Sequence, residues 1–338
     1  MVLEEFNAPL VLRERKIPTP SEGEVIMRVG ASGVCRTDLK IWHGKHPSTK
    51  KLPHIPGHEI AGEVVEVGKG VDKNIIGKHA VIYAYLSCGE CNFCRSGREP
   101  LCSHLKGQIG FNLDGGFAEY LKTSLHSLFF IRSDIPFEHA SIIADAIATP
   151  YRALTSKVKI QPGETLAVIG AGGLGIHAIQ IAKAFGARVF AVDINEKALA
   201  MAQEMGAERT LLVTKEDPTE AMIELSGGSG VDAVLELAGK PEMQKAALHM
   251  LKAAGRFVAI GYDADTPFQV NSQLLVSKEL EIYGSRSCGR NDLKASIDLV
   301  SSSKVKPVIT KSHPLNEANS ALHQLEKGEM VGRSVLVP

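Results

Sequence analysis

The strongest constraint on the fold is a glycine-rich hexapeptide between an apolar run and a helical pattern. It reads Gly170-Ala171-Gly172-Gly173-Leu174-Gly175 and follows directly after the apolar run 165–169. In such a GxGxxG pattern the first glycine permits a tight turn, the second lets the backbone approach a pyrophosphate, and the third lets the helix pack against the strand. The pyrophosphate then meets unpaired N–H groups at the helix N-terminus. The hexapeptide therefore predicts a dinucleotide site formed by Gly170, Gly172, Gly173, Leu174 and Gly175.

An acidic residue at the end of the next apolar run supports this interpretation over a purely structural turn. Asp193 lies eighteen residues after Gly175, where a carboxylate can accept hydrogen bonds from the adenosine ribose hydroxyls. The same carboxylate would repel a 2′-phosphate, and Ile194-Asn195 offers no arginine to neutralise one. We therefore expect NAD as the cofactor rather than NADP, although Lys197 follows closely in the sequence.

Apolar runs alternate with helical patterns throughout the region around the hexapeptide. Six runs are predicted as strands, at 165–169, 188–192, 210–213, 231–235, 256–260 and 280–283. Between the first two, four apolar residues share one predicted helical face: Leu174, Ala178, Ile181 and Phe185. Pro241 suits the first turn of a helix over 242–251. This alternation predicts an α/β fold with a Rossmann doubly wound parallel sheet.

The first 145 residues have a different pattern, with short β-like runs and frequent glycine. Val25, Met27 and Val29 recur at a period of two, which indicates one buried strand face. Further strands are predicted at 61–67 and 79–85, and the chain ends in a strand-like run at 334–337. We expect a β-rich domain before the Rossmann domain, because 338 residues exceed what one core usually holds.

Composition and charge exclude several classes of function. The chain has 38 basic and 38 acidic side chains, so it offers no general electrostatic attraction to nucleic acid or to anionic lipid. No apolar run approaches the roughly 20 residues that span a bilayer. Because Met1–Glu5 already carries two carboxylates and no leader pattern follows, we expect a cytoplasmic protein with no nucleic-acid or membrane partner.

Four of the six cysteines form a compact cluster. Their spacing is C-x2-C-x2-C-x7-C: Cys88, Cys91, Cys94 and Cys102. Four thiolates at short spacing can close a tetrahedral zinc site within a single loop, whereas disulfides between cysteines three residues apart require strained geometry. The cluster therefore predicts a structural zinc, in preference to a redox or iron–sulfur site.

Several motifs in order resemble the zinc-containing medium-chain alcohol dehydrogenases. They are Gly33-Val34-Cys35-Arg36-Thr37-Asp38, Gly57-His58-Glu59-Ile60-Ala61-Gly62 with Gly68 and Val71, the four cysteines, the GxGxxG hexapeptide, and the closing Gly332-Arg333. The resemblance covers essentially the whole chain. It implies a GroES-like catalytic domain at 1–147 with a zinc lobe at 86–104, an NAD-binding Rossmann domain at 148–286, and a return to the catalytic domain at 287–338.

By this resemblance, Cys35 and His58 are ligands of a catalytic zinc. The third ligand of the family falls at Asp145, which departs from the set of two cysteines and one histidine. Glu59 is the other candidate, as an outer or alternating ligand. Three protein ligands leave one position open for an alcohol or carbonyl oxygen. The chain is thus expected to hold two zinc ions, one catalytic and one structural.

The resemblance also implies a proton relay and a cofactor contact. Thr37 matches the family hydroxyl that bonds the substrate oxygen. Lys40 stands where many relatives carry histidine, and we hypothesise that it shuttles protons poorly, with His43 or water substituting. Arg333 matches an arginine that reaches the cofactor pyrophosphate, and Arg290 is a weaker candidate for the same role.

The sequence does not assign a definite role to two other residues, Trp42 and Cys288. Trp42 falls near the expected substrate cleft and equally suits core packing. Cys288 has no motif around it and receives no role.

The leading hypothesis is reversible oxidation of an alcohol, polyol or sugar hydroxyl with hydride transfer to NAD. One alternative is a zinc-retaining enoyl or quinone reductase, because the sequence does not fix which substrate meets the nicotinamide. Another is a non-catalytic nucleotide-binding relative, which would be expected to lose ligands that this chain retains. The expected partner is a small alcohol or carbonyl compound, and a homo-oligomer is expected, a tetramer in preference to a dimer.

Overall fold

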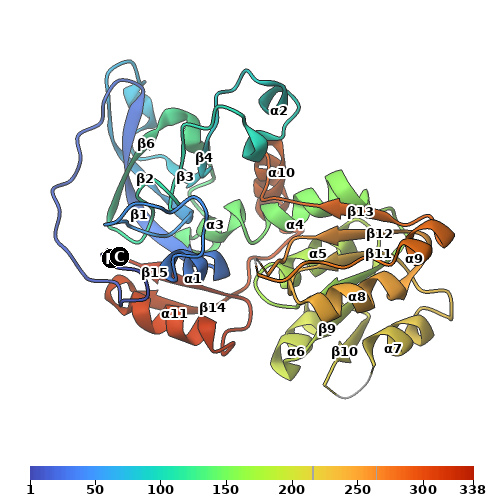
Figure 1. Ribbon diagram of the computed structural model, residues 1–338. Helices are drawn as coiled ribbons and strands as arrows, with labels where there is room; N and C mark the ends of the chain where they lie inside the picture. Colours follow the sequence, from blue (N-terminus) through green and yellow to red (C-terminus); the bar gives the residue numbers. More distant parts are fainter. Residues whose placement is uncertain (215–216, 264) are drawn as a thin grey trace. The chain divides into compact units, whose positions relative to one another are not determined.

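The computed structural model describes residues 1–214, 217–263 and 265–338, and it divides the chain into two compact units (Figure 1). Unit 1 contains Met1–Ala146, Cys288–Ser301 and Pro307–Pro338, and unit 2 contains Ile147–Ser287 and Ser302–Lys306. The segment Ser302–Lys306, which the sequence division placed in the C-terminal return, thus clusters with unit 2. The reason is local: the Gln180 side chain donates to Lys306 O at 2.9 Å and accepts from Lys306 N at 2.8 Å.

A seven-stranded sheet forms the centre of unit 1. Its order is β14-β15-β1-β2-β3-β7, with β6 also paired to β1. The strands are β1 (Glu24–Val34), β2 (Glu59–Val67), β3 (His79–Ile82), β6 (Tyr120–Ser124), β7 (Leu128–Phe130), β14 (Ile309–Pro314) and β15 (Arg333–Val337). All pairs are antiparallel except β14 with β15. The N-terminal and C-terminal parts of the chain therefore share one sheet, because β15 pairs directly with β1.

The predicted patterns of unit 1 need two corrections. Val25, Met27 and Val29 are buried as expected, but Ile26 is fully buried as well, so both faces of β1 are covered at this point. The run 79–85 is not one strand, because the chain leaves the main sheet after β3. It continues as β4 (Tyr85–Leu86), which pairs with β5 (Gly107–Gln108) in a separate two-stranded sheet.

Short helices connect the strands of unit 1. The α-helices are α1 (Arg36–Trp42), α2 (Asn92–Arg95), α3 (Phe137–Ser141), α10 (Arg290–Ser301) and α11 (Ala318–Glu326). The 3₁₀ turns are η1 (Lys73–Ile75), η2 (Glu99–Leu101), η3 (Leu125–Ser127), η4 (Ile142–Ala144) and η6 (Leu315–Glu317). In the described part of the chain, no helix has the length and apolar content of a bilayer span.

Unit 2 contains a six-stranded parallel sheet, which confirms the predicted doubly wound α/β fold. Its order is β10-β9-β8-β11-β12-β13. The strands are β8 (Thr165–Ile169), β9 (Arg188–Asp193), β10 (Arg209–Leu212), β11 (Val231–Glu236), β12 (Leu251–Ala259) and β13 (Glu281–Gly284). Successive strands extend the sheet in one direction from β8 and in the other from β11, so the topological switch point lies between these two strands.

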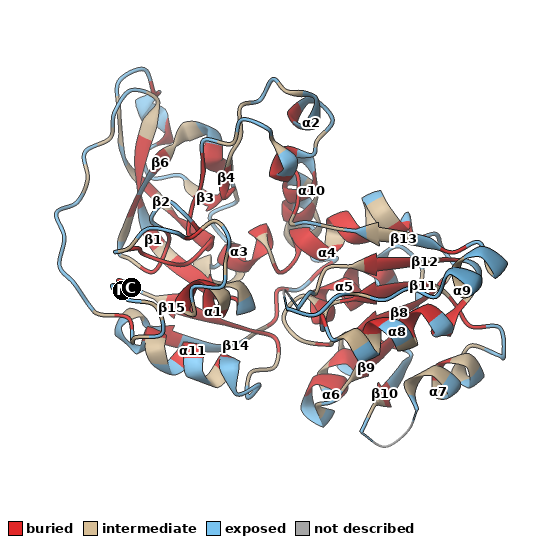
Figure 2. Ribbon diagram, in the orientation of Figure 1, coloured by how far each residue is buried: buried red, intermediate tan, exposed pale blue. Residues whose placement is uncertain are grey.

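Helices flank this parallel sheet, whose central strands are buried (Figure 2). They are α4 (Ala148–Arg152) with the π-helical η5 (Ala153–Val158), α5 (Gly175–Ala184), α6 (Glu196–Glu204), α7 (Pro218–Leu225), α8 (Pro241–Met250) and α9 (Ser272–Ser277). Pro241 opens α8 as predicted. Of the predicted helical face, Ala178 and Ile181 are buried, whereas Phe185 lies just beyond α5 and is 36% exposed, so that assignment is wrong.

Candidate functional site

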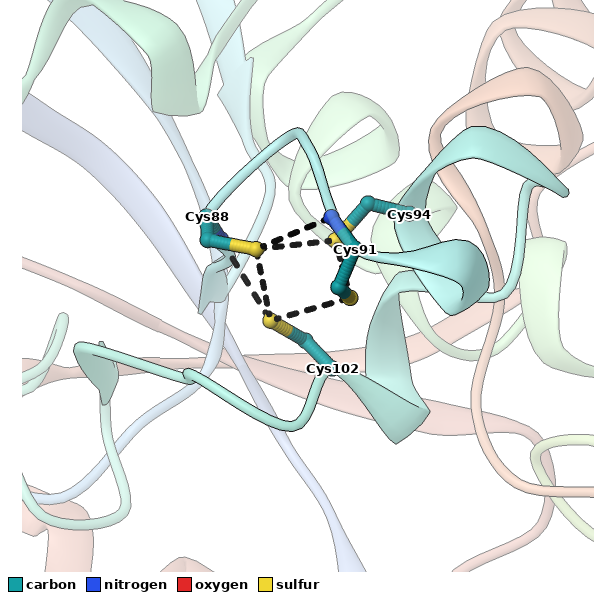
Figure 3. Close-up of side chains that lie close together, drawn as sticks. All are labelled: Cys88, Cys91, Cys94 and Cys102. Atoms are coloured by element: carbon teal, nitrogen blue, oxygen red, sulfur yellow. Dashed lines mark hydrogen bonds between the residues drawn. The ribbon is translucent and has the colours of Figure 1, made fainter.

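The four clustered cysteines of unit 1 bring their sulfur atoms together (Figure 3). We call Cys88, Cys91, Cys94 and Cys102 the four-cysteine group. Four of its Sγ–Sγ distances are 3.8, 3.5, 3.9 and 3.5 Å. A tetrahedron with Zn–S bonds of about 2.3 Å has edges of about 3.8 Å. The sulfur positions therefore fit a tetrahedral four-thiolate zinc site.

Backbone N–H groups favour the thiolate form in the four-cysteine group. Cys91 N lies 3.4 Å from Cys88 Sγ, and Cys88 N lies 3.4 Å from Cys102 Sγ. Backbone hydrogen bonds from Cys94 and Ser103 lower the pKa of Cys91 to about 5, and bonds from Glu90 and Cys91 lower the pKa of Cys88. Burial raises the pKa of Cys94 to about 12 in the metal-free group, and a bound cation would offset that cost.

A second set of donor atoms converges in unit 1 from distant parts of the chain. We call Cys35, His58, Glu59 and Asp145 the mixed-donor group, since one ligand atom from each lies within 4.8 Å of the others. Cys35 follows β1 and precedes α1, and His58 and Glu59 lie at the start of β2. The antiparallel register that pairs Gly33 with Glu59 brings these two segments together. Asp145 follows the 3₁₀ turn η4.

The distances within the mixed-donor group suit a shared metal ion. Asp145 Oδ2 lies 3.4 Å from Cys35 Sγ and 3.8 Å from His58 Nε2. Tetrahedral zinc with bonds of about 2.0 to 2.3 Å separates unlike ligand atoms by about 3.3 to 3.6 Å. Cys35 and His58 are buried, and the Asp145 side chain is 17% exposed. The residues present therefore fit a zinc ion with one partly accessible side.

Arg333 supplies a buried positive charge to the same group. Its Nη2 lies 2.6 Å from Glu59 Oε1, 3.0 Å from Asp145 Oδ2 and 3.5 Å from Cys35 Sγ. Burial alone would lower the pKa of Arg333, but the charges of these three neighbours raise it. The resemblance assigned Arg333 to the cofactor pyrophosphate. That role stays a prediction, while the structure adds contacts with the mixed-donor group.

Glu59 is held in a fully enclosed position. Its side chain is 0% exposed, and burial raises its pKa well above the usual range. Neither carboxylate oxygen makes a hydrogen bond of good geometry within the described residues, so the ion pair with Arg333 is its main compensation. A Cβ on Gly33 would lie 2.0 Å from Glu59 Oε2. Glycine at position 33 is therefore required by the close approach of this carboxylate.

Asp38 is a site residue to which the sequence analysis gave no role. It is 1% exposed, its Oδ2 accepts from Cys35 N at 2.8 Å, and its Oδ1 lies 3.3 Å from His58 Nδ1. Burial lowers the pKa of His58, but the Asp38 charge and bonds to Asp145, Asp38 and Cys35 raise it well above the usual range. A carboxylate behind a metal-binding histidine fixes the ring and its tautomer. Its position three residues after Cys35 was the available signal.

The candidate relay residues lie on or beside α1. Thr37 and Lys40 are half-buried in this helix, three residues apart. His43, the alternative to Lys40 in the proposed relay, directly follows the helix. Its ring nitrogens lie 2.8 Å from Asn7 Oδ1 and 2.8 Å from Glu326 Oε1. Both His43 nitrogens thus already have partners in unit 1.

Three further residues have structural positions in unit 1. Trp42 is 4% exposed, donates to Ala8 O at 2.6 Å and stacks on His43, so it belongs to the core. The Arg290 guanidinium lies 4.6 Å from the centre of the Phe129 ring and donates to His126 O at 2.6 Å. Cys288 is buried, with its thiol 3.4 Å from Ala144 O.

In unit 2 the glycine hexapeptide joins β8 to α5. Gly170 has a φ of +95°, which favours glycine. A Cβ on Gly175 would lie 1.9 Å from Gly170 O, so the helix can approach the strand only with glycine at position 175. A Cβ on Gly172 would meet no protein atom within 4 Å. Protein packing therefore does not require glycine at position 172, which fits a position kept open for a ligand.

Asp193 ends β9 and is bound to the hexapeptide. Its Oδ2 accepts from Ala171 N at 2.7 Å, and its Oδ1 accepts from Asn195 N at 2.9 Å. Asn195 in turn caps α6 through Lys197 N and Ala198 N. Each carboxylate oxygen can accept further bonds, so Asp193 can orient the loop and still receive ribose hydroxyls.

These observations define a class of protein. A doubly wound sheet with a glycine loop and an acidic residue binds dinucleotides, and a buried thiol, imidazole and carboxylate set binds zinc with an open position. The combination describes a metal-dependent dinucleotide oxidoreductase.

Comparisons with known proteins identify the family. Residues 21–132 match the alcohol dehydrogenase GroES-like domain, and residues 173–302 match the zinc-binding dehydrogenase family. An alcohol dehydrogenase of Geobacillus stearothermophilus is 38% identical over 99% of this chain and 97% of its own length. An NAD-dependent alcohol dehydrogenase of Sulfurisphaera tokodaii is 35% identical over 100% of this chain and 99% of its own length.

A solved structure agrees with these matches. The alcohol dehydrogenase of the hyperthermophilic archaeon Aeropyrum pernix superposes with a TM-score of 0.92 at 33% identity, covering 100% of this chain and 99% of that one. The chain therefore belongs to the zinc-containing medium-chain alcohol dehydrogenase family, with a GroES-like domain and a Rossmann domain.

Proposed function

We propose that this chain catalyses reversible oxidation of a primary or secondary alcohol, a polyol or a sugar hydroxyl to an aldehyde or ketone, with hydride transfer to NAD. The family and its members named NAD-dependent alcohol dehydrogenases support this reaction over enoyl or quinone reduction. The observation that carries the proposal is the mixed-donor group, whose four ligand atoms lie within 4.8 Å of one another. The protein is thus an NAD-dependent zinc alcohol dehydrogenase.

Cys35, His58 and Asp145 are the proposed ligands of the catalytic zinc. Asp145 is favoured over Glu59 because its Oδ2 lies close to both Cys35 Sγ and His58 Nε2. Arg333 contacts both carboxylates, Glu59 Oε1 at 2.6 Å and Asp145 Oδ2 at 3.0 Å, so the preference for Asp145 rests on its distances to Cys35 and His58.

When bound, zinc supplies Lewis-acid chemistry: it lowers the pKa of a substrate hydroxyl during oxidation and polarises a carbonyl in the reverse direction. The other steps belong to the chain itself. Asp38 Oδ1, 3.3 Å from His58 Nδ1, holds the imidazole with Nε2 directed at the metal position. Thr37, in the first turn of α1, is proposed to accept a hydrogen bond from the substrate hydroxyl and to pass its own hydroxyl proton on to water as it takes up the substrate proton. Lys40 lies three residues further along this helix and is expected to shuttle protons poorly, so water is proposed to carry the proton onward.

NAD is proposed to bind unit 2. The hexapeptide would receive the pyrophosphate, with its backbone close to Gly172 and the N-terminus of α5 directed at the charge. Asp193 would receive the adenosine ribose hydroxyls and disfavour NADP. Its contact with Ala171 N supports this assignment, because the same carboxylate then holds both the loop and the ligand.

The four-cysteine group is proposed to hold a second, structural zinc. Four protein ligands fill a tetrahedral site, so this ion would stabilise the lobe around α2 and leave no position for substrate. Two zinc ions per chain follow from the two groups.

We also propose a cytoplasmic homo-oligomer, and a tetramer in preference to a dimer. The edge strand β13 supports association, because an open edge exposes unpaired N–H and C=O groups to another chain. Exposed apolar residues before this strand add to it: Tyr262 is 53% and Val276 is 74% exposed. Light scattering of the purified protein measures the oligomer directly.

A panel of alcohols, polyols and sugars with NAD, and of aldehydes and ketones with NADH, tests the proposed reaction. Metal analysis of the same preparation counts the zinc ions. The expected result is alcohol-dependent NADH formation with two zinc ions per chain. NADH binding without turnover on any member of the panel would support the non-catalytic alternative, and consumption of NADH by enoyl or quinone substrates alone would support a reductase.

A further inference from the structure

Glu236 is a buried carboxyl group that the proposed chemistry does not use. It is the last residue of β11, where the preceding Ala233, Val234 and Leu235 are buried and apolar. Its own side chain is 0% exposed, and burial raises its pKa. A buried carboxyl group is costly unless hydrogen bonds compensate for lost water. Its partners therefore indicate what the group does.

Those partners belong to the turn that follows β11. Glu236 Oε1 accepts from Gly239 N at 2.8 Å, and Oε2 lies 3.4 Å from the Gln244 Nε2 of α8. The main-chain oxygen of Glu236 accepts from Ile260 N at 2.9 Å and Gly261 N at 3.1 Å. One residue thus binds both the turn 237–239 and the segment that follows β12.

The turn 237–239 packs directly against the glycine hexapeptide. Leu237 N donates to Ile169 O at 2.9 Å, at the end of β8. A Cβ on Gly170 would lie 3.4 Å from Ala238 N, and a Cβ on Gly175 would lie 3.4 Å from Leu237 Cδ1. A shift of this turn would therefore displace the glycine hexapeptide, which is proposed to receive the pyrophosphate.

The other side of the turn is equally constrained. A Cβ on Gly239 would lie 2.5 Å from Tyr262 N, and a Cβ on Gly261 would lie 2.5 Å from Gly239 N. Backbones of the segments after β11 and β12 are therefore in close contact. The three segments that follow β8, β11 and β12 form one packed layer at the carboxyl ends of these strands, at the switch point where doubly wound sheets bind their ligands.

We propose that Glu236 is a positioning residue for the dinucleotide. Its buried carboxyl group fixes the turn 237–239, and this turn holds the glycine hexapeptide and the 260–262 segment in the arrangement that receives the cofactor. This inference rests on the proposed function in one respect, namely that unit 2 binds NAD. It requires neither bound zinc nor an alcohol substrate.

Titration of the full-length protein with NADH, followed by fluorescence, tests the proposal without turnover. Glu236→Leu removes both acceptors, and we expect NADH affinity to fall roughly tenfold or more, the consequence of leaving a buried N–H unpaired. Glu236→Gln keeps an oxygen for Gly239 N but sets its amide against Gln244, so a smaller fall is expected. In turnover assays the change should fall on the KM for NAD rather than on kcat. Should Glu236→Leu not fold, the glutamine variant carries the test.

Asp232→Asn is a matched control at the other end of β11. Asp232 accepts from Thr165 N at 2.9 Å and is ion-paired with Lys252. Its substitution therefore also weakens polar contacts between neighbouring strands. We expect it to lower Tm without weakening NADH binding. The proposal is overturned if Asp232→Asn weakens NADH binding as much as Glu236→Leu does, if the folded Glu236 variants bind NADH like wild type, or if the wild-type protein binds no NADH. Wild-type protein that binds NADH but oxidises no alcohol refutes the proposed reaction alone, and the expected pattern among the variants would still support the role of Glu236.

Discussion

The two proposed metal-binding groups of unit 1 are built in opposite ways. The four-cysteine group comes from one fifteen-residue segment and has four identical donors. The mixed-donor group combines a thiol, an imidazole and two carboxyls, and Cys35 is 110 residues from Asp145. Arg333, a further 188 residues after Asp145, completes its charge balance. A single loop positions the first group, whereas the fold of unit 1 around its β-sheet positions the second.

The two groups should therefore differ in how strongly they respond to substitutions elsewhere in unit 1. Local turns and backbone N–H groups arrange the four-cysteine group, so it depends little on the rest of the fold. The mixed-donor group depends on the pairing of β1 with β2 and of β1 with β15, which brings Arg333 to the site. Changes in its surroundings should therefore alter metal binding as much as changes in the ligands themselves.

Substituting one cysteine in each group should affect alcohol oxidation very differently. Cys35→Ser should lower kcat/KM for an alcohol by roughly 10³-fold or more, because Lewis-acid assistance supplies several kcal/mol and each 1.4 kcal/mol is a factor of ten. Cys102→Ser should lower Tm and remove one zinc while the folded protein still oxidises alcohol. Equal loss of activity in both variants at a temperature where both are folded would break the distinction.

The next largest effect concerns the buried charges around Arg333. Arg333→Met leaves the buried Glu59 carboxylate without its cation, and breaking such a pair typically costs about 3 to 5 kcal/mol. We expect that loss in urea unfolding of the metal-free protein, and a smaller loss after zinc is added. Adding Glu59→Gln to the variant should restore part of the stability. An unchanged unfolding midpoint for Arg333→Met would contradict the proposed charge balance.

A smaller effect is expected for the residue behind His58. Asp38→Asn keeps the shape of the side chain and removes its charge, and such outer partners of metal ligands typically contribute 10- to 100-fold to metal affinity, here on the order of tenfold. Chelator competition should show this loss for one of the two zinc ions. The four-cysteine group serves as the internal control, and weakening of both ions would indicate a general defect of folding.

The smallest expected effect is in the number of protons released on metal binding. Because the Asp38 charge and neighbouring hydrogen bonds raise the pKa of His58, we expect the ring to carry a proton before zinc binds and to lose it on binding. Affinity at the mixed-donor group should therefore rise with pH until it passes the pKa of His58. In the four-cysteine group, backbone hydrogen bonds from Cys94 and Ser103 lower the pKa of Cys91 to about 5, so this thiol should contribute little to proton release at neutral pH, whereas Cys94, whose pKa is raised by burial, should contribute a proton.

Calorimetry in buffers of different ionisation enthalpy counts these protons. Asp38→Asn, which removes a charge that raises the pKa of His58, should release fewer protons at the mixed-donor group than wild type. Equal proton release by the two proteins would show that Asp38 does not control this histidine.

The same contrast between local and long-range contacts determines which parts of the fold and of the site could be predicted from the sequence. The parallel sheet could be predicted, because strands such as β8 are buried on both faces and appear in the sequence as continuous apolar runs between helical patterns. The four-cysteine group could also be predicted from sequence, because its four ligands lie within one short segment. The mixed-donor group was found only through resemblance, since spacing along the chain carries no information about the register of β1 and β2.

Contacts that depend on the folded surroundings were missed. Asp38 and Glu236 are ordinary acidic residues in the sequence, and only burial against His58 and against the turn 237–239 gives them a role. Periodicity predicts Phe185 on one helical face with Ala178 and Ile181, but α5 ends one residue before it. Helical periodicity does not indicate where a helix ends.

Diffraction from crystals of the active, zinc-loaded protein, recorded with anomalous scattering at the zinc edge, would locate each zinc ion. We expect two peaks in each chain. One lies among the four sulfurs of the four-cysteine group, and the other lies at about 2.3 Å from Cys35 Sγ and about 2.0 Å from His58 Nε2, with an Asp145 oxygen completing the protein ligands. An active protein whose crystals show no zinc between Cys35 and His58 would contradict this expectation.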